Sequence, residues 1–139
     1  MKDIRPALRA FLSGDPAIAA IVGSGSAAKI YPVKIPQGVK AACIVYARIS
    51  GPGDYFMEGP SGLVRHRLQL DSWAPTADAA TALANLVKDR IDGFSGVMGT
   101  GGIAVNVQGV FQTDLREDYD DAAALHRCGR DFTFAYEEL

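Results

Sequence analysis

The chain has 139 residues, of which 48% are hydrophobic and 22% are charged, and its formal net charge is −2. This length and composition fit a single domain over residues 1–139 with its own core, and they exclude a disordered or collagen-like chain. Fourteen Lys and Arg residues against sixteen Asp and Glu residues exclude the strong basic excess that is typical of a nucleic-acid-binding protein.

The N-terminal segment predicts neither a secretory signal nor a membrane span. Charged residues interrupt its apolar residues at Lys2, Asp3, Arg5 and Arg9. The longest uncharged run, residues 93–113, is broken by glycines and polar residues, which a membrane span would not tolerate. Cys43 and Cys128 form no CxxC motif, so we expect buried free thiols.

Two short helices are predicted first. Asp3 is placed to cap the first helix, whose apolar residues recur at helical spacing: Ile4, Leu8, Phe11 and Leu12. Gly14 ends this helix, and Asp15-Pro16 begins a second helix that ends at Gly23. Residues 29–32 then predict a short extended piece at a sheet edge, because a proline ends it.

Two strands and a long connection follow. Residues 42–49 are β-branched and nearly all apolar, which favours a central strand. Residues 64–73 alternate between an apolar set that includes His66 and a charged set that includes Arg65 and Arg67. The connection, residues 51–63, holds Tyr55, Phe56, Met57 and Glu58 among four glycines. Because hairpin loops usually have 2–5 residues, this connection predicts a functional arm or an extended hairpin.

The second half of the chain predicts a long helix and two more strands. The helix begins after Thr76 and runs to about Arg90, and the glycine-rich residues 93–102 end it, with a turn at residues 99–102. The inward residues of the next strand are predicted to be Ile103, Val105, Val107 and Phe111, and those of the last strand Cys128, Phe132, Phe134 and Tyr136. The predicted fold class is therefore α+β, with a mainly antiparallel sheet of four to five strands, an N-terminal helical pair and one long helix packed on the sheet.

No pattern of catalytic or metal-binding residues stands out. The possible soft-metal ligands are His66, His126, Cys43 and Cys128, which provide only one short spacing and are expected to be inert core residues. Residues 99–102 precede a strand and lack a phosphate-binding motif, and Ser61 and Ser95 lack the surroundings of a nucleophile. We expect no enzyme activity, no cofactor and no metal.

Two groups of charged residues could serve interactions. The first is an acidic segment, predicted to be a solvated loop because it lacks the calcium-loop alternation: Asp114, Glu117, Asp118, Asp120 and Asp121. In a cyclic assembly these carboxylates would form a negative ring that repels DNA phosphates. The second group is Arg65 and Arg67, expected beside Arg48 on a solvated strand face, from which they could also bind phosphate or pair with carboxylates of a neighbouring subunit.

Taken in order, these elements resemble the tail completion or tail terminator family of long-tailed phages, prophages and gene transfer agents. The motifs that support the resemblance are residues 5–8, 11–12, 15–16, 21–23, 30–32, 36–38, 44–46, 49–51, 68–73 and 91–94. One departure is Ala41-Ala42-Cys43, where a proline is expected before the strand. The match therefore depends on the order and spacing of elements rather than on a chemical signature.

The resemblance implies a virion structural protein without catalysis. Its subunits are expected to close into a ring, typically a hexamer, that caps the finished tail tube and meets the head–tail connector proteins. The partners are then further copies of the chain, the tube protein and the connector, with DNA only passing through the ring and no membrane. The location implied is the tail–head interface of a virion assembled in the host cytoplasm.

Other functions compete with this interpretation. A head–tail connector that docks under the portal would also be a ring of small subunits, whereas a cytosolic ligand-binding domain or a hydrolase would need a closed pocket. For the ring, a cyclic contact needs two different surfaces on each subunit. We expect the arm and the acidic segment to provide subunit or tail-tube contacts, through Tyr55, Phe56, Met57, Glu58, Arg65, Arg67, Asp118 and Asp120.

Overall fold

A computed structural model describes residues 3–50, 53–56 and 59–137. Its helices are α1 (Ile4–Ser13), α2 (Pro16–Val22) and α3 (Ala77–Ile91), with short 3-10 helices at Gly25–Ala27 and Gly101–Ile103. Its strands are β1 (Ile30–Pro32), β2 (Cys43–Ser50), β3 (Gly53–Phe56), β4 (Gly59–Ala74), β5 (Gly96–Met98), β6 (Val105–Asp120) and β7 (Leu125–Glu137). None of the described helices is long and apolar enough to cross a membrane.

The three helices begin where the sequence places their caps. The side chains of Asp3, Asp15 and Thr76 accept hydrogen bonds from backbone N–H groups of the first helical turns. The apolar stripe of α1 is buried at Ile4, Leu8 and Leu12, while Phe11 is half-buried against the Phe94 ring, 4.6 Å away. The predicted helical pair and long helix are therefore confirmed.

The strands form one mixed sheet in the order β1-β2-β4-β7-β6-β5, with β3 paired to β4 outside this path. The described pairs are antiparallel except β1 with β2, so the α+β class and the mainly antiparallel sheet are confirmed. The expected four to five strands are wrong, because the described residues form seven strands in this sheet. The two missed strands, β3 and β5, come from glycine-rich segments, whose low strand propensity is overcome by pairing with longer neighbours.

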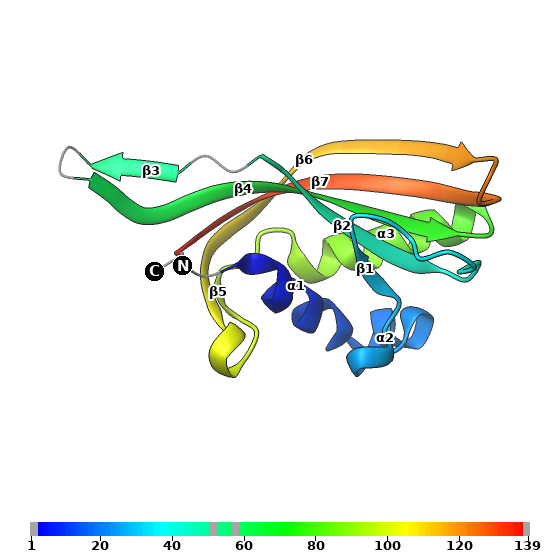
Figure 1. Ribbon diagram of the computed structural model, residues 1–139, viewed down its shortest axis with the longest axis horizontal. Coiled ribbons are helices and arrows are strands. Elements are labelled where there is room, and N and C mark those ends of the chain that lie inside the picture. Colours follow the sequence, from blue (N-terminus) through cyan, green and yellow to red (C-terminus); the bar gives the residue numbers. More distant parts are fainter. Residues whose placement is uncertain (1–2, 51–52, 57–58, 138–139) are drawn as a thin grey trace.

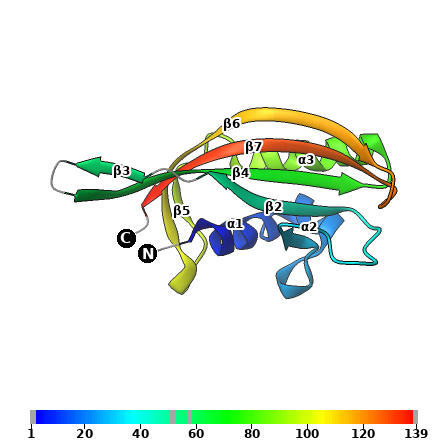
Figure 2. The same ribbon diagram turned by 45° about the horizontal axis from the view of Figure 1, so that its top comes forward.

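Helices α1, α2 and α3 all lie against one face of the sheet (Figures 1 and 2). We call this the helix face and the other the open face. Alternate residues of β4 follow this division: Leu68 and Leu70 are buried on the helix face, whereas Arg67 and Gln69 point to the open face. His66 is also buried, and its Nδ1 lies 2.7 Å from the hydroxyl of Tyr136. The predicted alternation in this strand is confirmed.

Strand β6 departs from simple alternation at two places. A register shift between Val107 and Gly109 places Val110 opposite Phe134 in the core. Phe111 is consequently 59% exposed, so its prediction as an inward residue was wrong. A β-bulge adds one residue to a strand and so reverses the face to which the following residues point. The composition of the segment does not mark this insertion, so the sequence alone predicts one continuous alternation of inward and outward residues.

The acidic segment is strand rather than loop as far as Asp120. Strand β6 pairs with β7 continuously to its end, where Asp120 lies opposite Leu125, and a second register shift falls between Gln112 and Asp114. The prediction of a solvated loop from Asp114 was therefore wrong. Charges that are paired across strands permit a long polar strand that local propensity does not indicate.

The bulge predicts that substitutions at two neighbouring residues will change the free energy of unfolding by different amounts. Val110→Ala should lower the free energy of unfolding by about 2 kcal/mol, because it leaves a cavity in the core. Phe111→Ala should cost less than about 1 kcal/mol despite removing a larger side chain, because most of that side chain is exposed. Denaturant unfolding of both variants measures the difference. A larger loss for Phe111→Ala would contradict the described register.

Candidate assembly surface

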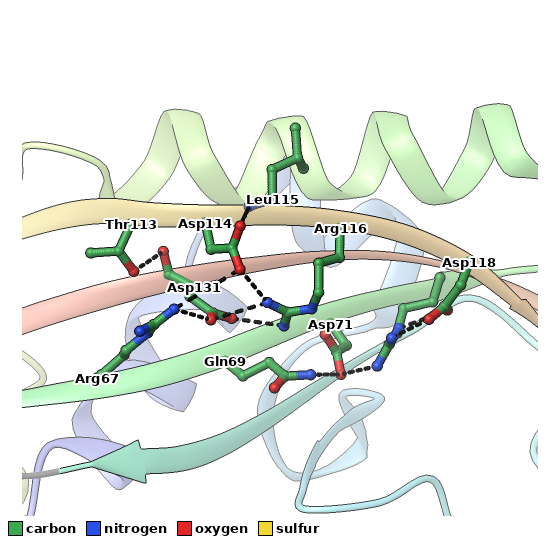
Figure 3. Close-up of polar contacts among 10 residues, drawn as sticks. Arg67, Gln69, Asp71, Thr113, Asp114, Leu115, Arg116, Asp118 and Asp131 are labelled. Carbon is green, nitrogen blue, oxygen red and sulfur yellow. Dashed lines mark hydrogen bonds and ion pairs between the residues drawn. The ribbon is translucent and has the colours of Figure 1, made fainter.

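The open face of the sheet has a group of charged and polar side chains on three adjacent strands (Figure 3). Alternate residues of a strand point the same way, so every second residue of β4, β7 and β6 contributes to this face. We call the group the open-face network; it consists of Arg67, Gln69, Asp71, Asp114, Arg116, Asp118, Arg127 and Asp131.

Asp131 of β7 is the centre of this network, and its side chain is only 2% exposed. Arg116 of β6 donates to its Oδ1 at 2.9 Å, and Arg67 of β4 donates to its Oδ2 at 2.8 Å. Burial acts to raise the pKa of Asp131, but the hydrogen bonds from Arg116 and Arg67 outweigh it and hold the pKa below its usual range. One carboxylate therefore joins three strands through charge-assisted hydrogen bonds.

Asp71 of β4 has a different environment, although it lies on the same face. It is 7% exposed, and its Oδ2 accepts a hydrogen bond from Gln69 at 2.8 Å. Its Oδ1 has no hydrogen-bond partner among the residues described, and burial raises the pKa of this carboxyl. Gly129 provides the room, since a Cβ there would lie 2.5 Å from Oδ1. Any side chain at position 129 would displace the carboxylate.

Arg127 closes the network near the β6–β7 turn. Its Nε donates to Asp118 at 2.8 Å, its Nη1 lies 3.5 Å from Asp71, and its guanidinium lies 5.7 Å from the centre of the Trp73 ring. Asp114 is also paired, with Arg116 at 2.8 Å. Asp114 and Asp118 thus form ion pairs within the subunit, and the negative ring expected of a cyclic assembly stays a prediction.

The predicted interface residues lie in several different parts of the structure. Arg67 and Asp118 belong to the open-face network, whereas Asp120 accepts hydrogen bonds from the backbone N–H groups of the β6–β7 turn. Arg65 is exposed on β4. Arg48 is not beside it on the same face, because Arg48 donates to Asp3 at the start of α1.

The remaining predicted interface residues belong to the connection between β2 and β4. Tyr55 and Phe56 lie in β3, of which only the backbone is described, and Met57 and Glu58 lie outside the described residues. The sequence reasoning missed Asp71, Arg116, Arg127 and Asp131 as members of one group. Their signal was the recurrence of charge at every second position in residues 114–118, and the charges of Arg127 and Asp131 four positions apart in the last strand.

The described side chains include no group of three His, Cys, Asp or Glu residues that could hold a metal ion. His126 packs against the Tyr119 ring at 4.6 Å, far along the sheet from the buried pair of His66 and Tyr136. Both cysteines are buried and free, and burial raises the pKa of Cys43 to about 11. A thiol with that pKa stays protonated at neutral pH and is a poor nucleophile.

A hairpin projects beyond the end of the sheet (Figures 1 and 2). Strand β3 pairs with β4 from Gly53 opposite Val64 to Phe56 opposite Gly59, and the described pairing of β4 with β7 runs from Leu63, opposite Glu137, to Ala74. We call β3 together with residues 59–62 the arm. The prediction of an extended hairpin between the two strands is confirmed.

Comparison with known proteins identifies relatives. The family model described as "Tail completion protein gp17" matches residues 6–137. Among solved structures, a chain of "Virion of native gene transfer agent (GTA) particle" is similar in fold, with a TM-score of 0.69 and 19% identity over 96% of this chain and 94% of that chain. No curated protein matches the sequence.

The two buried carboxylates predict opposite effects of neutral substitution. Asp131→Asn should cost about 2 kcal/mol at pH 7, because two guanidinium groups lose their charged partner. Its lowered pKa means that this stabilisation is present above pH 4 and is lost as the pH falls through the folded-state pKa. The difference from the parent should therefore shrink in acid.

Asp71→Asn is the matched control on the same face. Because the pKa of Asp71 is raised, ionisation at neutral pH works against folding, and the parent gains stability relative to this variant as the pH falls. Denaturant unfolding between pH 3 and pH 7 measures both variants. Equal costs for the two substitutions at every pH would contradict the described environments.

Proposed function

The chain belongs to the tail completion protein gp17 family, and from this premise we propose that it is a tail terminator. In this proposal it forms a ring that caps the tail tube of a phage, prophage or gene transfer agent particle and joins the tail to the head connector. The observation that supports it most is the family match over nearly the whole chain, residues 6–137. The family is structural, and we propose that this member acts by assembly rather than by catalysis.

The shape of the subunit supports a ring. A cyclic ring is built from heterologous contacts, in which two different surfaces of each subunit meet. The arm and the open face are two such surfaces on one chain, and they differ in shape and chemistry.

The proposed partners are further copies of the chain, the tail tube protein and the head–tail connector. The arginines of the open-face network are already paired with carboxylates, and the whole chain has a net charge of −2. Strong phosphate binding needs unpaired basic residues, so DNA in this proposal passes through the ring without being held. Tyr55, Phe56, Met57, Glu58 and Arg65 are proposed to make contacts through the arm and its base.

Removal of the arm tests this function. Deleting residues 54–59 should leave a folded subunit, because β3 pairs with β4 outside the path of the other described strands. The variant should fail to complete tails, since it lacks one of the two contact surfaces. The variant is supplied to cells that produce particles lacking this protein, and electron microscopy of the resulting tails measures how many are completed. Normal particles from the deletion variant would refute the role of the arm.

The mass of the assembly gives a second test. Six copies of the 14.7-kDa chain would have a mass of about 88 kDa, as a closed cyclic hexamer requires. Light scattering of the purified protein alone and in the presence of tail tubes measures this mass. A single-chain mass under both conditions would contradict the ring.

A further inference from the structure

We propose that the arm of one copy docks in a groove on the open face of a second copy. The groove lies at the base of the second copy's own arm, where β4, β6 and β7 meet. This inference builds on the proposed ring and specifies which two surfaces form the contact between subunits. It concerns a site made of described residues, distinct from the open-face network.

The groove has a volume of about 630 Å³, and its lining includes three small residues, Gly62, Gly109 and Ala135. Leu63 and Phe111 add apolar surface to this lining, and Arg65, Gln108 and Glu137 add polar surface. The Phe111 ring folds over Gly109, where a Cβ would lie 2.8 Å from the ring. The β-bulge and the glycine thus place an aromatic ring beside a hollow instead of filling it.

The arm needs a surface to pack on. A two-stranded hairpin is marginally stable in water unless it packs against something else or gains a third strand. Among the described residues, Gly59 and Pro60 pair with Phe56 and Tyr55 of β3 and with no other strand. The arm's sequence includes two consecutive aromatic residues, Tyr55 and Phe56, and aromatic residues are enriched at the centres of protein–protein contacts.

A second copy is the occupant that fits this geometry. The arm projects away from the body of its own subunit in both views (Figures 1 and 2), whereas the groove lies on the body. The volume of the groove falls within the 300–1,000 Å³ typical of sites that bury a ligand of a few rings, so aromatic side chains of an arm suit it. Arm and groove differ, so the contact is heterologous and can repeat around a ring.

Mixed disulfide formation tests the contact. One preparation carries Phe56→Cys in the arm, and a second carries Ala135→Cys in the groove. As a control receptor, a third carries Ala122→Cys in the exposed β6–β7 turn at the other end of the sheet. The native cysteines are buried and should not interfere. Unfolding curves verify that each variant is folded before mixing.

Docking should make the arm–groove disulfide at least about tenfold more abundant than the arm–turn disulfide, because it raises the effective concentration of the two thiols. An excess in a species of ring mass supports both the docking and the proposed ring. An excess in a two-chain species supports the docking but contradicts the ring. If the arm–groove disulfide is no more abundant than the arm–turn disulfide, the docking is refuted whatever the mass of the assembly. A ring mass in that case would still support the proposed function.

Substitution of the groove wall provides an independent measurement. Phe111→Ser should lower the fraction of assembled chains at least about tenfold at a given concentration, as expected when a buried aromatic contact is lost. Leu115→Ser is the matched control, because Leu115 is 46% exposed on the same strand and does not line the groove. Equal assembly by the two variants would overturn the role of Phe111.

Discussion

The carboxylate of Asp131 is the interaction on which the open face of the sheet depends. Three central strands meet at this side chain, and two arginines from the strands on either side bind it. A sheet with helices on only one face must satisfy the polar groups of its other face from within or from water. Here two arginines satisfy the Asp131 carboxylate from within the face, whereas Oδ1 of Asp71 has no partner among the described residues.

Glycine at two positions makes these arrangements possible. Gly129 leaves space for the Asp71 carboxylate, and Gly109 leaves space for the Phe111 ring. In both cases a side chain from a neighbouring position occupies the volume that a Cβ would need. The missing Cβ of a glycine therefore makes room for a charged group at one end of the sheet and for an aromatic ring beside a hollow near the arm.

These features divide the open face into two regions with different capacities for binding. The network pairs its arginines with carboxylates, which limits its attraction for a charged partner. The region near the arm is hollow and combines apolar residues with Arg65, Gln108 and Glu137, and burial of its apolar part favours stable association. An assembly contact is thus favoured near the arm and disfavoured over the network.

The sequence by itself determined the helices, the buried alternation of β4 and β7, and the extended hairpin, because capping residues and short-period patterns are local properties. It also identified the family through the order of these elements. Only the tertiary structure decided the bulge that exposes Phe111, the strand at 96–98 and the partners of Asp131. Register and cross-strand pairing join residues far apart in the chain, and no local pattern specifies which charge will lie opposite which.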